Sequence, residues 1–387
     1  MIRRLLLASS ASVVFAFALA CGPDPGGPDL YRLAINGSPT GSFLSAFVYD
    51  EATASVGFVA GGFVGVDHSR LPPSGVGRLL EYRRAQFTTR CTSNEVLWWV
   101  TGVRDSGGAM VVYAAGEGAR VIRFRNGACE TLETGLMFPE GMPTFWGILA
   151  RAVDDVWFVG GSASPTGPRG VLVHYDGTTF ERVSDLPVAA QTLNLYKVDA
   201  ATDGTIIVVG ERGMILYRPP GVTAWSVANA NARASDNRLF TVSCARTGQP
   251  LCYAVGGSGV GLLLRYSGGA WSSLAFAEES PGLNGVAVQD ANNIFIVGVD
   301  GTTIHHNGQT VGRNNYRPAM ALTSATLHGV GASTTVVLAV GGELNTNTPE
   351  QRGVILVRGD DSPTFTLDGQ SFMASGQLRR SLGGAGQ

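Results

Sequence analysis

The sequence predicts an all-β fold, and within that class a seven-bladed β-propeller built from four-stranded antiparallel blades. Three observations lead to this prediction. One pattern of apolar runs and glycines recurs seven times along the chain. The runs are short and rich in Val, Ile, Phe and Trp, which favours strands over helices. Several runs are apolar at every position, which is typical of strands that are covered on both faces.

The recurring pattern is an apolar run, a glycine, a short polar turn, a second apolar run that often carries a tyrosine, and an aromatic residue. The segments "VWFVGGSASPTGPRGVLVHYDGTTF" (residues 156–180) and "IIVVGERGMILYRPPGVTAW" (residues 206–225) both follow it. The glycines that close the first run recur about every 47 residues, which is within the range of propeller blades. They are Gly61, Gly116, Gly160, Gly210, Gly256, Gly298 and Gly341.

Each copy also has an apolar piece before it, such as "LNGVAVQD" (residues 283–290), and an aromatic strand after it, such as "AWSSLAF" (residues 270–276). This makes four short strands per unit. Closing the units into a ring would cover the apolar faces that a single blade leaves in water. We therefore predict a propeller over residues 30–370 and a flexible tail over residues 371–387. Either "LYRLAI" (residues 30–35) or "TFTL" (residues 364–367) could complete the last blade.

The order "GG…Y…W" resembles kelch repeats, and the form "VG…G…HYDG…W" is similar to BNR-like repeats of bacterial propellers. The resemblance implies the propeller fold and leaves the function open, because propellers have many unrelated roles. The "SxDxGxTW" box that is typical of sialidases is missing.

The amino terminus has the pattern of an export signal. Arg3 and Arg4 precede an apolar run, and small residues lead up to Cys21. Residues 1–20 are therefore predicted to be a signal peptide, and ordinary cleavage and lipoprotein processing would both leave Cys21 first. The segment "ALAC" (residues 18–21) resembles the lipobox of bacterial lipoproteins, which implies that Cys21 is acylated and holds the protein at a membrane. Residues 21–29 are rich in Gly and Pro, as a tether would be.

Five cysteines in an exported chain leave one unpaired, and Cys21 is the obvious one. Cys244 and Cys252 are expected on consecutive strands of one hairpin, and Cys91 and Cys129 near the start and end of the second unit. We predict two disulfides from these pairs, against the alternative of four buried thiols.

The composition argues against several classes of function. Lys and Arg number 28 against 30 Asp and Glu, so there is no net positive charge to attract nucleic acid. His174, Tyr175 and Asp176 align with other residue types in the other copies, so we interpret them as the end of a strand and its turn. His305 and His306 should point to opposite faces of a strand and not share a metal. We therefore assign no catalytic residue, metal or cofactor.

The copies differ in the loop between their second and third strands, which is long in units one, three and seven. In known propellers these loops lie on the face that usually binds partners, and units seven and one become neighbours when the ring closes. We therefore expect partner-binding residues there, against the alternative that the loops are tolerated surface insertions. The candidates are Asp67, His68, Arg70, Arg169, Asn345, Asn347 and Arg352.

These observations favour a monomeric lipoprotein of the bacterial cell envelope that binds a protein or glycan and is not an enzyme. The rival prediction is a carbohydrate-active hydrolase or lyase. Such an enzyme should bring carboxylates from several inner strands to one mouth of the channel. Inner-strand segments such as "LFTVSCA" (residues 239–245) are acid-free, which favours binding.

Overall fold

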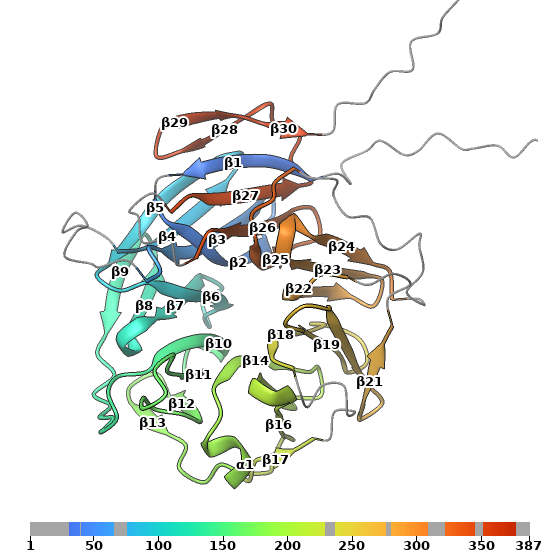
Figure 1. Ribbon diagram of the computed structural model, residues 1–387. Helices are drawn as coiled ribbons and strands as arrows, with labels where there is room; N and C mark the ends of the chain where they lie inside the picture. Colours follow the sequence, from blue (N-terminus) through green and yellow to red (C-terminus); the bar gives the residue numbers. More distant parts are fainter. Residues whose placement is uncertain are drawn as a thin grey trace, which may run out of the picture.

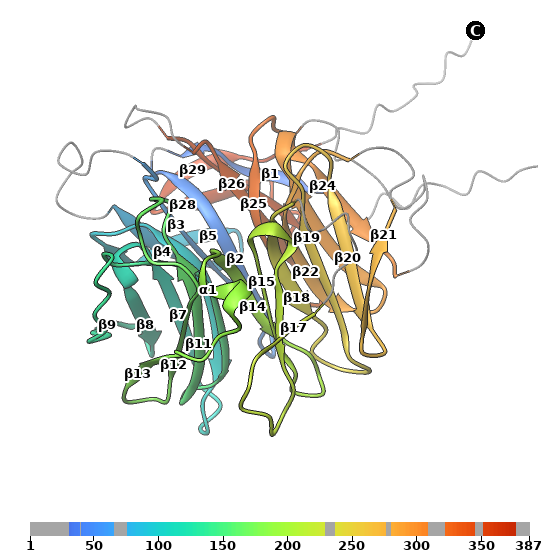
Figure 2. The same cartoon turned by 60° about the horizontal axis from the view of Figure 1, so that its bottom comes forward.

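The computed structural model describes residues 31–38, 40–65, 76–228, 237–275, 280–308, 322–344 and 351–376. Seven sheets stand around a central axis, each with its first strand innermost, which confirms the predicted seven-bladed β-propeller (Figure 1). Figure 2 shows the blades from the side, standing next to one another. Within the described residues, no helix is long and apolar enough to cross a membrane.

The strands of blades 1 to 4 follow one another in chain order from the axis to the rim. Blade 1 has β2 (Ser42–Asp50), β3 (Ser55–Gly62), β4 (Gly77–Arg83) and β5 (Gln86–Ser93). Blade 2 has β6 (Leu97–Arg104), β7 (Met110–Gly116), β8 (Val121–Arg125) and β9 (Ala128–Leu132). Blade 3 has β10 (Thr144–Ala152), β11 (Asp155–Gly161), β12 (Val171–Tyr175) and β13 (Phe180–Arg182). Blade 4 has β14 (Leu195–Ala200), β15 (Ile206–Gly210), β16 (Ile215–Arg218) and β17 (Ser226–Val227).

The remaining blades continue the ring. Blade 5 has β18 (Leu239–Cys244), β19 (Leu251–Gly256), β20 (Leu262–Ser267) and β21 (Ala270–Leu274). In the described part of blade 6 there are three strands, β22 (Leu283–Asp290), β23 (Asn293–Gly298) and β24 (Thr303–His306). Blade 7 has β25 (Leu327–Ala332), β26 (Val337–Gly342) and β27 (Gly353–Arg358). The helices in the described residues are short and lie in connections: η2 (Glu117–Ala119), α1 (Val188–Gln191), η3 (Glu211–Gly213) and η4 (Val299–Gly301).

Both terminal segments take part in closing the ring. β1 (Arg32–Ser38) pairs antiparallel with β27 and supplies the fourth strand of blade 7. β28 (Thr364–Leu367) pairs with β5 in parallel and extends blade 1 instead. Two strands continue beyond the expected domain boundary at Gln370: β29 (Gln370–Met373) completes a hairpin with β28, and β30 (Ser375–Gly376) pairs with β1.

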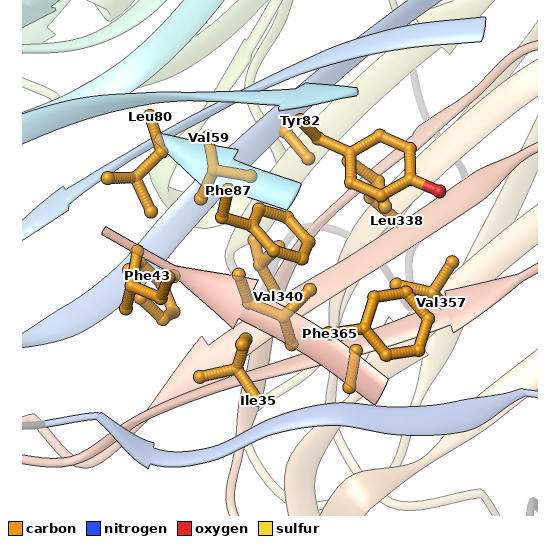
Figure 3. Packing of buried hydrophobic residues seen from close by; sticks show 14 of the residues in the cluster. Ile35, Phe43, Val59, Leu80, Tyr82, Phe87, Leu338, Val340, Val357 and Phe365 are labelled. Carbon is orange, nitrogen blue, oxygen red and sulfur yellow. The ribbon is translucent and has the colours of Figure 1, made fainter. Parts of the chain in front are cut away.

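The hydrophobic core is divided among the seven interfaces between neighbouring blades, and each interface has its own buried cluster. The second strands β3, β15, β19 and β26 are buried along their whole length, which explains their uninterrupted apolar sequences. At the closing interface, Ile35 of β1 lies in one cluster with Phe43, Val340 and Phe365 (Figure 3). This cluster therefore joins β1 and β28, which lie near the two ends of the described residues.

The aligned glycines are required by a close backbone approach that recurs in every blade. Each glycine is the last or the penultimate residue of the second strand and pairs with a Phe or Leu near the start of the inner strand. A Cβ at the glycine would stand only 1.7 to 2.3 Å from a carbonyl oxygen at the start of that strand. Any larger residue would push the two strands apart, so the repeat has a structural cause.

Both predicted disulfides are present. Cys244 and Cys252 face each other on β18 and β19 of blade 5. Cys91 of β5 and Cys129 of β9 connect the outer strands of blades 1 and 2 across 38 residues of sequence. A bond between neighbouring blades restricts the unfolded chain and resists separation of that interface.

Candidate functional site

Each of the seven inner strands has a register shift of one residue directly after the Phe or Leu that pairs with the aligned glycine. The residue left out of the ladder is a β-bulge, a feature that redirects a side chain. The seven bulge residues all line one cavity of about 940 Å³ at this end of the channel. They are Leu44, Trp98, Trp146, Tyr196, Phe240, Asn284 and His328.

Four bulge residues on consecutive blades, Trp98, Trp146, Tyr196 and Phe240, form what we call the aromatic arc. The ring centroids of Trp146 and Tyr196 lie 5.3 Å apart, and those of Tyr196 and Phe240 lie 5.7 Å apart. All four side chains are partly exposed to the cavity. The arc thus offers flat apolar surface on one side of the mouth.

Two members of the arc are held by acidic residues of the short helices that follow the second strands. The indole Nε1 of Trp98 donates to Glu117 at 3.4 Å, and the hydroxyl of Tyr196 donates to Glu211 at 3.2 Å. Burial, together with the nearby Glu211 carboxylate, raises the pKa of Tyr196 to about 12. Tyr196 therefore stays protonated and keeps its bond to Glu211.

The opposite side of the mouth is polar. The amide of Asn284 donates to the carbonyl of Leu327 at 3.0 Å. The Nε2 of His328 lies 2.9 Å from the carbonyl oxygen of Gly342, which requires the proton on Nε2. Burial lowers the pKa of His328, so this imidazole is neutral at neutral pH.

The floor of the cavity is built from residues that directly follow the bulges, chiefly Lys197 on blade 4 and Trp99 on blade 2. The Lys197 side chain crosses blade 3, whose residue at this position is Gly147. Its Nζ donates to the carbonyl of Trp146 at 2.6 Å and lies 3.1 Å from the ring centroid of Trp99. Lys197 is 6% exposed, and burial lowers its pKa well below the usual value.

Of the residues predicted to bind a partner, the structure describes Arg169 and Arg352 and places them at different cavities. Arg352 lines the channel cavity and packs against Gly37. Arg169 lines a second cavity between blades 3 and 4, where it bonds to Glu211 at 3.1 Å. Glu211 also accepts the hydrogen bond from Tyr196, so Arg169 is connected to the aromatic arc through this carboxylate. The other candidates lie outside the described residues, namely Asp67, His68, Arg70, Asn345, Asn347 and the predicted lipidation site Cys21.

The polar triplet of the third unit has the local role that the sequence indicated. His174 bonds to Asp155 at 3.0 Å, and its ring lies tilted against that of Trp157 with the centroids 4.3 Å apart. Asp176 accepts hydrogen bonds from the backbones of Thr178 and Thr179, as a turn residue does. In the part of the chain that the structure describes, no three His, Cys, Asp or Glu side chains gather as a metal site would require.

Sequence reasoning missed the bulge residues and Lys197. A strict alternation of inward and outward side chains contains no sign of a bulge. A usable signal did exist, because in every unit the bulge residue directly follows the first Phe or Leu of the inner strand, as Tyr196 follows Leu195. The residues at these positions are aromatic in blades 2 to 5.

No protein-family model matches the chain, and no curated protein does, so the kelch or BNR type of the repeats stays a prediction. The fold is similar to solved propellers. YCF48 bound to D1 peptide has a TM-score of 0.55 at 13% identity, with 87% of this chain and 98% of that chain covered. The extracellular domain of a putative hybrid two component system, BT4673 from B. thetaiotaomicron, has a TM-score of 0.55 at 14% identity, with 85% of this chain and 39% of that chain covered.

An enzyme is among the similar structures as well. Virginiamycin B lyase from Staphylococcus aureus has a TM-score of 0.53 at 11% identity, with 84% of this chain and 98% of that chain covered. At such identities the likeness extends to the fold, and propellers of one fold differ in what they do.

Proposed function

We propose that this protein is an exported binding module that takes a peptide segment of a partner protein into the mouth of its channel. The observation that carries the proposal is the ring of bulge residues, which directs seven side chains from seven blades into one cavity. A cavity of about 940 Å³ is of the size that binding sites have. The aromatic arc would hold apolar side chains of the peptide, and Asn284 and His328 face it across the mouth.

A peptide fits the polar features of the cavity better than a neutral glycan does. Aromatic rings stack on both classes of ligand, so the arc alone does not distinguish them. The cations Lys197, Arg238 and Arg352 also line the cavity, and peptides carry carboxylates that such cations bind. The peptide-bound structure of YCF48 supports the proposal at the level of the fold.

The rival proposal is a carbohydrate-active hydrolase or lyase. The similar fold of virginiamycin B lyase supports a lyase at the level of the fold. Glycoside hydrolysis commonly needs two carboxylates on either side of the bond that is cut. Among the described residues that line the cavity, Glu343 is the one carboxylate. This arrangement favours binding over hydrolysis.

Export and anchoring complete the proposal. The basic and apolar leader predicts export, and the two disulfides support an oxidising compartment. Acylation of Cys21 would hold the protein at the cell envelope, with residues 21–29 as a tether. Lasting attachment to a membrane needs more than one acyl chain, and the cysteine of a lipoprotein carries several.

Substitution of the aromatic arc tests the binding site. We expect the double variant Trp146→Ala and Tyr196→Ala to capture its partner from envelope extract at least about tenfold less well, because buried aromatic anchors carry much of the binding energy of an interface. The matched control is Trp271→Ala, which removes an aromatic side chain from β21 at the rim of blade 5. Equal capture by the arc variant and the native protein would refute the proposed site. A glycan array with the same proteins tests the glycan alternative.

Substitution of Cys21 tests the anchor. Cells grown with a radioactive fatty acid are expected to label the native protein, and the Cys21→Ala variant is expected to lose the label and leave the membrane fraction. The variant Ala18→Leu serves as the control, because leucine is the lipobox preference at that position and the label should persist. Labelling of Cys21→Ala would show that the fatty acid is attached elsewhere.

A further inference from the structure

Lys197 is the single lysine of the chain, and it lies at the floor of the channel cavity. It directly follows the bulge residue Tyr196 on β14, so the same distortion of the strand positions both side chains. Lysine is almost never fully buried unless it is paired, because removing its charge from water is costly. A side chain that is 6% exposed at this place therefore needs an explanation.

The contacts of the Lys197 ammonium leave it without a counterion. An ammonium has three N–H donors, and the described partners are one carbonyl oxygen, that of Trp146, and the face of Trp99. The acid two positions along the strand, Asp199, bonds instead to Arg246 at 2.7 Å and to the backbone of Cys244 at 2.8 Å. No ion pair of the described residues includes Lys197.

The other charged groups among the described lining residues of the cavity favour an anionic ligand, because positive groups outnumber negative ones. Arg238 and Arg352 line it from blades 5 and 7, and the exposed Glu343 is the carboxylate among the described lining residues. Among the described lining residues, the two other titratable side chains are Tyr196 and His328, and both are neutral at neutral pH. Glu211 behind Tyr196 is already paired with Arg169.

We propose, on the basis of the function proposed above, that Lys197 is the anion-binding residue of the channel cavity and receives a carboxylate of the bound peptide while the aromatic arc holds the apolar group next to it. The carboxylate would accept a hydrogen bond from the N–H of Lys197 that contacts neither the Trp146 carbonyl nor the Trp99 ring. It comes either from the carboxyl end of the peptide or from an Asp or Glu side chain.

Proton uptake accompanies this binding. In the free protein, burial lowers the pKa of Lys197, whereas a bound carboxylate favours the ammonium and raises that pKa again. Affinity is therefore greatest below the pKa of the free protein. It falls with rising pH between the two pKa values, by up to about tenfold per pH unit. His328, Glu343, Tyr196, Arg238 and Arg352 face the same cavity, so the titration has to be observed at Lys197 itself.

A single lysine makes that observation possible. Full-length protein with ¹³C at the lysine Cε gives one lysine resonance, whose chemical shift against pH reports the pKa of Lys197. Three probes are compared. N-acetyl-phenylalanine has a terminal carboxylate, and N-acetyl-phenylalanyl-aspartic acid α-amide has a side-chain carboxylate. N-acetyl-phenylalaninamide has no carboxylate. We expect at least one carboxylate probe to raise the pKa by about one pH unit or more and to bind at least about tenfold better than the amide. The stronger of the two identifies the source of the carboxylate.

Two variants complete the test. Lys197→Met keeps the length and the apolar contacts of the side chain and is expected to lose most of the preference for carboxylate over amide probes. The double variant Arg238→Gln and Arg352→Gln removes two positive charges from the cavity and should weaken the binding of carboxylate probes, but a bound carboxylate should still raise the pKa of Lys197. If no probe changes the pKa of Lys197, or if that change disappears in the arginine variant while it still binds carboxylate, the inference is overturned. The arc variants in the capture experiment test the proposed function separately, so each can fail without the other.

Discussion

The variant Gly256→Ala is expected to lose about 2–4 kcal/mol of unfolding free energy, although only one methyl group is added. The new Cβ would lie 1.9 Å from the carbonyl oxygen of Arg238 and 2.9 Å from its carbonyl carbon. Both atoms belong to the backbone at the start of β18, so no side-chain rotation relieves the contact. Urea denaturation measured by tryptophan fluorescence gives the difference in unfolding free energy.

Gly259→Ala is the control for this prediction, because Gly259 lies three residues further along and a Cβ there meets nothing within 4 Å. It should change the unfolding free energy by less than about 0.5 kcal/mol. The Gly256 variant should also bind partner less well, because the bulge that directs Phe240 into the cavity lies next to the same contact. Equal stability of the two variants would contradict our explanation of the repeat.

The second large effect is expected at the closure of the ring. Phe365 of β28 is fully buried in the cluster that joins β1, blade 1 and blade 7 (Figure 3). Replacing it by alanine should cost about 3–5 kcal/mol, since a ring-sized cavity remains between segments that are distant in sequence. Calorimetry measures the loss, and hydrogen exchange should show faster opening of β1 than of the inner strands.

A control for the closure comes from the same hairpin. Met373 on β29 is 80% exposed, and its replacement by alanine should leave the melting temperature nearly unchanged. If Phe365→Ala and Met373→Ala had the same melting temperature, the hairpin of β28 and β29 would not contribute to the stability of the closed ring.

The fold was predictable because its causes are local and repeated. A glycine is needed wherever the backbone of the inner strand approaches, as at Gly116 and Gly256, so the spacing of glycines gives the spacing of blades. Closure was not predictable in the same way. β1 and β28 are both short apolar strands, and nothing in their sequences shows that one pairs antiparallel with β27 and the other in parallel with β5.

The site was predictable only in part, since it depends on deviations from the regular pattern. Arg352 was a candidate because of the length of its loop; it lines the cavity, and its role in binding a partner stays a prediction. Tyr196 and Lys197 are adjacent in the sequence, where strict alternation would send them to opposite faces. The bulge at Tyr196 places both at the cavity, and it is visible only in the pairing of β14 with β15.

The direction of β1 has a consequence for how the molecule would be presented to its surroundings. Asn36 and Gly37, near the end of the strand, lie at the rim of the cavity, whereas Arg32 begins it, about 15 Å away at roughly 3.3 Å per residue. An attachment ahead of Tyr31, as proposed for Cys21, would therefore join β1 at the end of the strand that lies away from the cavity.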